Sequence, residues 1–197
     1  MYADGCNFTK QNKVKLSLQE QDGGILFSIL EDMHSNMPLR FHQQSKVNPN
    51  WSDLLIMTLS NKHISERLLE LGMVPCKSLV LTFPTFLSDE FMPHFIRGYV
   101  DGDGHIDIGK SKYVQIAGTS QFCKCLKDYI MEKLGIETYI YNTYNKESNI
   151  KVLVVRRKAD VLKFLDWMYN DAELYIRRKH EAYLELKEEM AKKTLSD

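Results

Sequence analysis

Net charge is the first thing this chain lacks, because its 26 lysines and arginines balance its 26 aspartates and glutamates. This balance neither favours nor excludes nucleic acid, since acidic residues elsewhere can offset a basic face. Long apolar runs are also missing: no stretch approaches the roughly 18 residues of a transmembrane helix. The N-terminus has no basic-then-apolar pattern of a signal peptide. We expect an intracellular protein of the cytoplasm or an organellar matrix, neither secreted nor membrane-bound.

Cysteine and histidine are scarce, and neither shows the spacing of a metal site. The 4 cysteines (Cys6, Cys76, Cys123 and Cys125) have no zinc-site spacing, which favours reduced structural thiols. The 6 histidines are scattered along the chain, so we interpret them as ordinary surface or core residues. If the chain binds a metal, carboxylates are the expected ligands.

Two short acid–glycine stretches are the most informative feature that is present. They are Tyr2–Gly5 and Val100–Gly104, and Asp4 and Asp103 within them are separated by about half the chain. Each is followed by a strand-like run and an amphipathic helix. A motif repeated at half-length indicates a duplicated fold with a shared site between the halves.

The segments after these stretches repeat one order of strands and helices. Val14 matches Val114 and Leu30 matches Ile130 in the two copies. In the first half the patterns predict strands over 13–19 and 54–59, helices over 25–33 and 64–71, and a polar, hairpin-like region over 34–51. In the second half they predict strands over 113–117, 138–143 and 151–156, and helices over 122–134, over 161–169 and from about 174. We therefore predict an α+β fold with two pseudo-symmetric repeats, 1–84 and 85–197.

A further helix is predicted from Phe91 to about Asp101, with Ser88 as its cap. Gly98 and Gly102 are four positions apart, so they share one face and permit close approach of another backbone. Asp101 and Asp103 lie at the C-terminal end, where a carboxylate opposes the helix dipole at a cost of about 0.3–1 kcal/mol. A bound cation would reverse that effect. The alternative is that Asp-Gly-Asp-Gly is only a turn signal.

The stretch Phe95–Gly104 resembles the LAGLIDADG motif of homing endonucleases, and Met1–Gly5 resembles the last half of a first copy. Leu134–Ile136, Val161–Leu165 and Tyr175–Lys179 also resemble segments of that family, so the resemblance covers nearly the whole chain. It implies two αββαββα-type repeats whose curved antiparallel sheets form a DNA-binding saddle. Two motifs in one chain imply a monomeric pseudo-dimer.

The resemblance also implies the site residues. Asp4 and Asp103 correspond to the last acid of each motif and would bind a divalent metal, Mg²⁺, beside the scissile phosphates. Asp101 is the earlier acid, a helix-end or interface residue, and Tyr2 takes its place in the first half. Lys77 and Lys179 occupy corresponding places near the ends of the repeats and are candidate catalytic residues that polarise water or neutralise phosphate charge in the transition state. The alternative for each is an ordinary surface lysine.

The strands would lie on DNA through their polar face. Arg40, His42, Gln44 and Lys46 alternate as in a strand that reads the major groove. The predicted DNA-binding residues are Lys13, Lys15, Gln19, Arg40, His42, Gln44, Lys46, Gln115, Tyr139, Tyr141, Arg156 and Arg157. The alternative is a solvated strand face without a ligand.

The leading functional prediction is a metal-dependent, site-specific double-stranded DNA endonuclease. The alternatives are a non-cleaving nucleic-acid binder of the same fold (an intron maturase, with intron RNA as partner, or a regulator) and a structural module. Only Met1 and Tyr2 precede Ala3-Asp4-Gly5, so the first motif lacks most of its helix. We therefore expect weakened stability, self-association through the face left unburied, or impaired cleavage. An Asp4 well ordered near Asp103 would count against this expectation.

Overall fold

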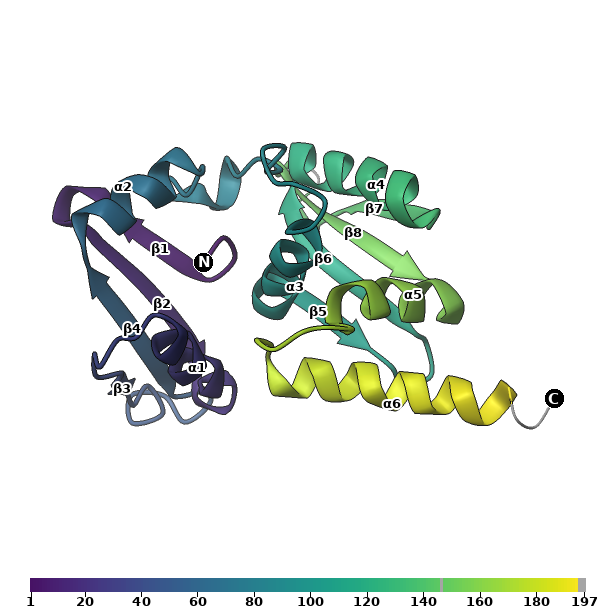
Figure 1. The fold of residues 1–197 in the computed structure, drawn as a ribbon, viewed down its shortest axis with the longest axis horizontal. Helices are drawn as coiled ribbons and strands as arrows, with labels where there is room; N and C mark the ends of the chain where they lie inside the picture. Colours follow the sequence, from purple (N-terminus) through teal and green to yellow (C-terminus); the bar gives the residue numbers. More distant parts are fainter. Residues whose placement is uncertain (146, 195–197) are drawn as a thin grey trace.

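Two four-stranded antiparallel sheets, one in each half, form the frame of the computed structural model, which describes residues 1–145 and 147–194 (Figure 1). Sheet A has the order β1-β2-β4-β3, and sheet B has the equivalent order β5-β6-β8-β7. The strands of sheet A are β1 (Gly5–Phe8), β2 (Lys13–Gln19), β3 (Arg40–His42) and β4 (Leu54–Ser60). Those of sheet B are β5 (Gly104–Asp107), β6 (Tyr113–Thr119), β7 (Thr138–Asn142) and β8 (Ile150–Arg156). The predicted α+β pseudo-repeat is confirmed.

Helices cover one face of each sheet and leave the other face open. They are α1 (Gly24–Asp32), α2 (Lys62–Glu70), α3 (Met92–Asp103), α4 (Ser120–Leu134), α5 (Lys158–Tyr169) and α6 (Arg177–Thr194), with short 3-10 turns η1 (Thr9–Gln11), η2 (Glu20–Asp22) and η3 (Lys77–Leu79). In Figure 1, α1 lies in front of sheet A, and α3 and α5 lie in front of sheet B. Within the described residues, no helix combines the length and the apolar character needed to cross a membrane.

The alternation of apolar and polar residues places the core under each sheet. Val14, Leu16 and Leu18 of β2 are buried, and Lys13, Lys15 and Ser17, which alternate with them, lie on the open face. The first half has a small core, in which Leu26 of α1 packs against β2. The second half has a larger core, which extends from α3 to α6 and includes the fully buried Phe122.

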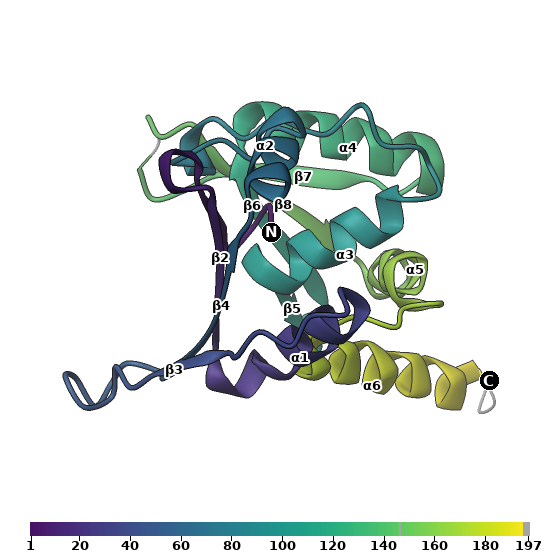
Figure 2. The same cartoon turned by 60° about the vertical axis from the view of Figure 1, so that its left-hand side comes forward.

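The polar region over 34–51 does not form its own hairpin. Its strand, β3, pairs with β4 and projects from the edge of the molecule (Figure 2). The strand-like alternation predicted for this segment is wrong beyond His42, because the amides of Val47 and Asn48 bond to the carbonyl of Gln44 and close a turn. The amide of Ser45 bonds to Asp53 Oδ1 (2.9 Å), which fixes the same turn.

The last helix also begins later than its predicted start near Leu174. Arg97 Nε donates to the carbonyl of Leu174 (2.9 Å), and the amide of Ile176 donates to Asp101 Oδ2 (3.0 Å). These backbone groups are therefore used in tertiary contacts with α3, and α6 starts at Arg177.

Candidate active site at the junction of the two halves

The two acid–glycine stretches meet between the halves. In the first stretch, the amide of Gly5 donates to the carbonyl of Met1 (2.9 Å), which closes a single turn. In the second, α3 ends at Asp103. A Cβ added to Gly102 would overlap Ala3 Cβ and lie 2.6 Å from Asp4 Oδ2. The absence of a side chain at Gly102 is therefore what lets the first turn pack against the end of α3.

This packing places the carboxylates of Asp4 and Asp103 in one region, where both still reach solvent. Partial burial raises the pKa of each carboxyl above its ordinary value. The Asp4 carboxylate raises the pKa of Asp103 further, and Lys77 and Lys179 oppose that rise. For Asp4, the N-terminal ammonium, Lys179 and Lys77 oppose the effect of burial. A cation bound between the two carboxylates would offset the repulsion that Asp4 exerts on Asp103.

Lys179 lies beneath the second stretch and is almost completely buried. Its Nζ donates to the carbonyls of Val100 (2.6 Å), Asp101 (2.6 Å) and Gly104 (2.7 Å), which uses all three ammonium protons. Burial is the main cause that lowers the pKa of Lys179 to about 8, and Arg178 lowers it further. The ammonium therefore holds the C-terminal carbonyls of α3, next to Asp103.

Lys77 has the equivalent position under the first stretch. It is buried, and its Nζ donates to the carbonyls of Ala3 (2.7 Å) and Gly5 (2.6 Å), on either side of Asp4. Burial lowers the pKa of its ammonium, and the Asp103 charge raises it. Lys77 and Asp103 also line a common recess of about 220 Å³. Both lysines are thus placed under the acid-bearing turns, and their catalytic role stays a prediction.

Asp101 is buried within the second half. It accepts hydrogen bonds from Tyr169 Oη (2.6 Å) and from the amide of Ile176 (3.0 Å), so it fastens α5 and the segment before α6 to α3. Tyr2, at the matching place in the first half, packs edge-on against Phe95 of α3, with ring centroids 5.0 Å apart. Tyr2 therefore adds an aromatic contact between the halves.

A bidentate ion pair joins the two halves, and the sequence patterns did not predict it. Arg178 Nε and Nη2 each lie 2.8 Å from a carboxylate oxygen of Asp22, whose side chain is only 7% exposed. Arg178 belongs to the Tyr175–Lys179 segment, and the resemblance of this segment to the homing endonucleases was the signal that the sequence offered. Its partner was not visible in the sequence, because Asp22 lies in an unrelated turn, η2.

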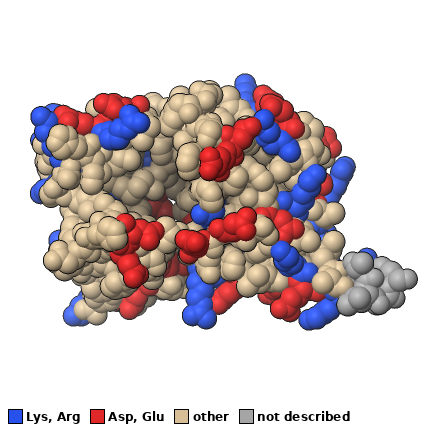
Figure 3. All heavy atoms as spheres, in the orientation of Figure 1, with Lys and Arg blue, Asp and Glu red and all other residues tan. Residues whose placement is uncertain are grey.

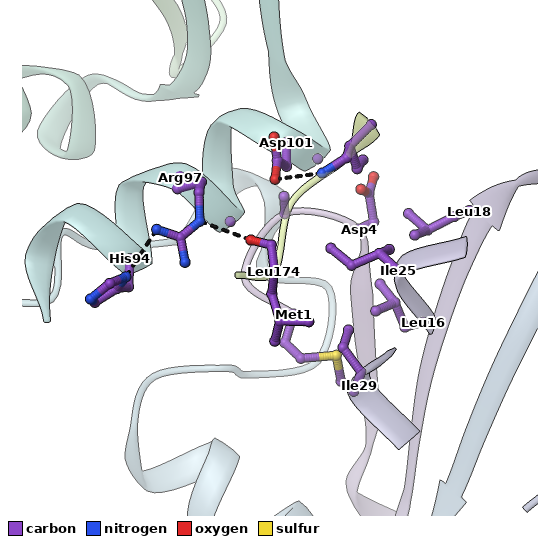
Figure 4. Close-up of a pocket in the computed structure, with 14 residues that line it drawn as sticks. Met1, Asp4, Leu16, Leu18, Ile25, Ile29, His94, Arg97, Asp101 and Leu174 are labelled. Atoms are coloured by element: carbon purple, nitrogen blue, oxygen red, sulfur yellow. Dashed lines mark hydrogen bonds between the residues drawn. The ribbon is translucent and has the colours of Figure 1, made fainter. Parts of the chain in front are cut away.

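A cavity of about 320 Å³ lies beside this junction (Figure 4). Leu16, Leu18 and Ile25 of the first half line one side, and Arg97 of α3 lines the other. Gly98 of α3 also lines the cavity, and a Cβ there would meet nothing within 4 Å. Of the two glycines expected to permit close approach, only Gly102 is in such a contact.

The candidate metal donors at the junction are the carboxylates of Asp4 and Asp103. Among residues 1–145 and 147–194, no group of three or more His, Cys, Asp or Glu side chains could hold a metal ion. Mg²⁺ nevertheless binds commonly through one or two carboxylates, with water and substrate phosphate as its other ligands. The carboxylates of Asp4 and Asp103, brought into one region from the two halves, fit that mode of binding.

The predicted DNA-contacting residues fall into three groups. Lys13, Lys15 and Gln19 on β2, Arg40 and His42 on β3, Gln115 on β6, Tyr139 and Tyr141 on β7, and Arg156 at the end of β8 have open-face positions in the strand registers. Gln44 and Lys46 lie in the turn region after β3. Arg157 precedes α5 and lies 3.8 Å from Glu137, with which it pairs.

Figure 3 shows the helix-covered side of the molecule. Acidic and basic side chains are interspersed on this side. The open sheet faces are therefore better candidates for a nucleic-acid surface than this side.

Residues 90–168, which include α3 and all of sheet B, match the family model described as LAGLIDADG-like domain. This part of the chain is similar to a LAGLIDADG-like domain. The LAGLIDADG-like match covers α3 and its Asp101–Gly104 end, where the second acid lies. No curated protein matches the chain in sequence.

Solved structures extend the LAGLIDADG fold over both halves. Full-length DUF199/WhiA from Thermatoga maritima matches with a TM-score of 0.60 and 13% identity, over 96% of this chain and 57% of that protein. The I-LtrWI LAGLIDADG homing endonuclease bound to target DNA matches with a TM-score of 0.57 and 12% identity, over 91% of this chain and 80% of that one. I-SmaMI, a LAGLIDADG homing endonuclease bound to cleaved DNA, gives 0.54 and 12%, over 94% and 82%.

The fold is therefore that of the LAGLIDADG homing endonucleases, with two four-stranded sheets in pseudo-repeats. WhiA has the same fold, and this chain spans little more than half of its length. At these identities the matches establish the fold, and the activity has to be argued from the site.

Proposed function

We propose that the chain is a site-specific endonuclease that hydrolyses phosphodiester bonds of double-stranded DNA with a divalent metal. The observation that carries the proposal is the meeting of Asp4 and Asp103, from opposite halves, above two buried lysines. Two open sheet faces flank this centre. Structures of the same fold are described as homing endonucleases bound to target or cleaved DNA.

In this proposal Asp4 and Asp103 hold Mg²⁺ between the protein and the phosphates. A divalent ion supplies a more acidic bound water and stabilises negative charge on phosphate oxygens. Lys77 and Lys179 keep the acid-bearing turns in place through their carbonyl contacts. Their positive charge also lies close to the region where phosphate charge increases during the reaction.

The alternative is a non-cleaving nucleic-acid binder of the same fold, such as an intron maturase that binds intron RNA or a regulator. One observation favours it: all three protons of the Lys179 ammonium are engaged with backbone carbonyls. In this reading the lysines have only a structural role, and the open sheet faces bind nucleic acid without cleavage.

The deciding experiment is incubation of the protein with a randomised duplex DNA library and Mg²⁺, followed by sequencing of the cut ends. We expect discrete cuts that a chelator abolishes and that Asp103→Asn also abolishes. The matched control is Asp128→Asn, an exposed acid on α4, which should cut like the wild type. Salt-sensitive binding without cuts would contradict the endonuclease and support the binder.

A further inference from the structure

The open faces of the two sheets have different chemistry. On sheet A the open face includes Lys13, Lys15 and Arg40, and the strand registers place no acidic side chain on this face of the described strands. Cations of this kind contact phosphate oxygens and fix the position of the protein on a duplex. Sheet A is therefore equipped mainly to hold a nucleic-acid backbone.

On sheet B the open face is mostly aromatic and aliphatic. A depression of about 480 Å³ is lined by Tyr113, Tyr141, Val152, Val154, Gln115 and Arg156, among others. The register places Gln115 opposite Val154, and Tyr141 opposite Val152, so these side chains share one face. Lys112 at the rim is already paired with Glu189 at 3.1 Å. Such a face is poorly suited to contacting a phosphate backbone along its length.

Two rings on this face already have neighbours. The Arg156 guanidinium stacks 3.6 Å from the ring centroid of Tyr139. The rings of Tyr113 and His105 lie 5.8 Å apart. The covered ring of Tyr139 is therefore not available for stacking on an unpaired base, which needs a free aromatic surface. The stack on Tyr139 instead fixes the direction of the Arg156 guanidinium, which favours bidentate hydrogen bonding to a base edge.

We propose that sheet B recognises the C5-methyl groups of thymines in an A·T-rich half-site, whereas sheet A holds the other half-site mainly through its phosphates. The inference rests on the proposed binding of duplex DNA. Thymine is the one base whose major-groove edge carries a methyl group, and apolar side chains contact it there. Gln115, beside Val154, has the amide that pairs with adenine N6 and N7. The duplex is the chosen occupant because the two faces flank one acidic centre.

The test begins with the duplex that the protein selects from a randomised pool. Each thymine of that duplex is replaced in turn by deoxyuridine, which removes only the methyl group. We expect replacements within one half-site to weaken binding about fourfold for each contacted methyl, and replacements in the other half-site to have little effect. Val152→Ser, which removes both methyl groups of the side chain, should abolish the sensitivity at one thymine, and the exposed Tyr141→Ala should do so at a neighbouring one.

Lys15→Gln on sheet A is the matched control. It should weaken binding to thymine and uracil duplexes equally and lower the salt slope by about 0.9. If a sequence is selected but no uracil replacement matters, the reading by sheet B is overturned and the binding of duplex DNA stands. A preference for single strands over duplex would also overturn the reading by sheet B. If no sequence is enriched, both the inference and the site-specific function are wrong.

Discussion

Lys179 and Asp103 show how single residues share the end of α3. The helix dipole places partial negative charge on the last carbonyls, so a carboxylate at Asp103 is unfavourable there and an ammonium is favourable. Lys179 donates to the carbonyls of Val100, Asp101 and Gly104. Part of the penalty expected for an acid at this position is therefore offset by the protein itself, before any metal binds.

The low pKa of Lys179 gives a pH prediction. Its folded-state pKa is about 8, below the ordinary value of 10.5. Between these values the unfolded chain binds more protons than the folded one, so this group's contribution to stability rises with pH across that window. The difference in unfolding free energy between wild type and Lys179→Met should widen as pH rises from about 8 to 10.5. Urea unfolding at several pH values measures it, with exposed Lys124→Met as the flat control.

The two glycines of α3 give a matched pair of substitutions. Gly98→Ala adds a methyl group into free space and should stabilise the protein by about 0.5–1 kcal/mol, as alanine does in a helix interior. In Gly102→Ala the added methyl group would push Ala3 and Asp4 away from α3, and we expect the protein to be destabilised by about 1–3 kcal/mol. Thermal and urea unfolding report both changes, and equal effects of the two substitutions would contradict the packing described.

At the scale of elements, α6 is attached to both halves. Lys179 and the amide of Ile176 bind the end of α3, and Arg178 binds Asp22 in η2 of the first half. These consecutive contacts surround the start of α6 at Arg177. The helix therefore links the first half to the acid-bearing end of α3.

The Asp22–Arg178 pair should be measurable by a double-mutant cycle. Arg178→Met leaves a buried carboxylate without its partner and should lower the unfolding free energy by about 1–3 kcal/mol. Adding Asp22→Asn should recover part of the loss. Arg177→Met is the control, because Arg177 is 88% exposed and pairs with Glu181 on its own helix, so we expect a change within about 0.5 kcal/mol. Simple additivity in the cycle would show that the pair is uncoupled.

For the whole molecule, metal binding and stability are linked through the junction. Mg²⁺ that binds only the folded state stabilises it, by about 2.7 kcal/mol when its concentration is 100 times its Kd. We therefore expect Mg²⁺ to raise the melting temperature of the wild type. The Asp4→Asn, Asp103→Asn double variant should melt at one temperature with or without Mg²⁺. An equal rise in both proteins would place the metal elsewhere.

Most of the second half could be predicted from local pattern. The helix that ends near Asp103, the strands β6, β7 and β8 and the long α4 follow from periodicity, caps and glycine, as Thr119 and Gly135 at the two ends of α4 illustrate, whereas the short β5 was not predicted. The segment after His42 and the start of α6 were predicted less well. Their backbone groups bond to Gln44, Asp53 and Asp101, and none of these partners is evident from the local periodicity.

The sequence by itself determined the duplication, the alternating strands and the two acids at equal places in the repeats, because these depend on residue type and short-range spacing. Only the tertiary structure decided that Ala3 and Asp4 pack on Gly102 while Gly98 borders a cavity. It also decided that the ammonium groups of Lys77 and Lys179 donate to backbone carbonyls. It likewise joined Asp22 to Arg178 across the two halves. Such contacts depend on how the two halves fit together, and the periodicity of one element carries no information about that fit.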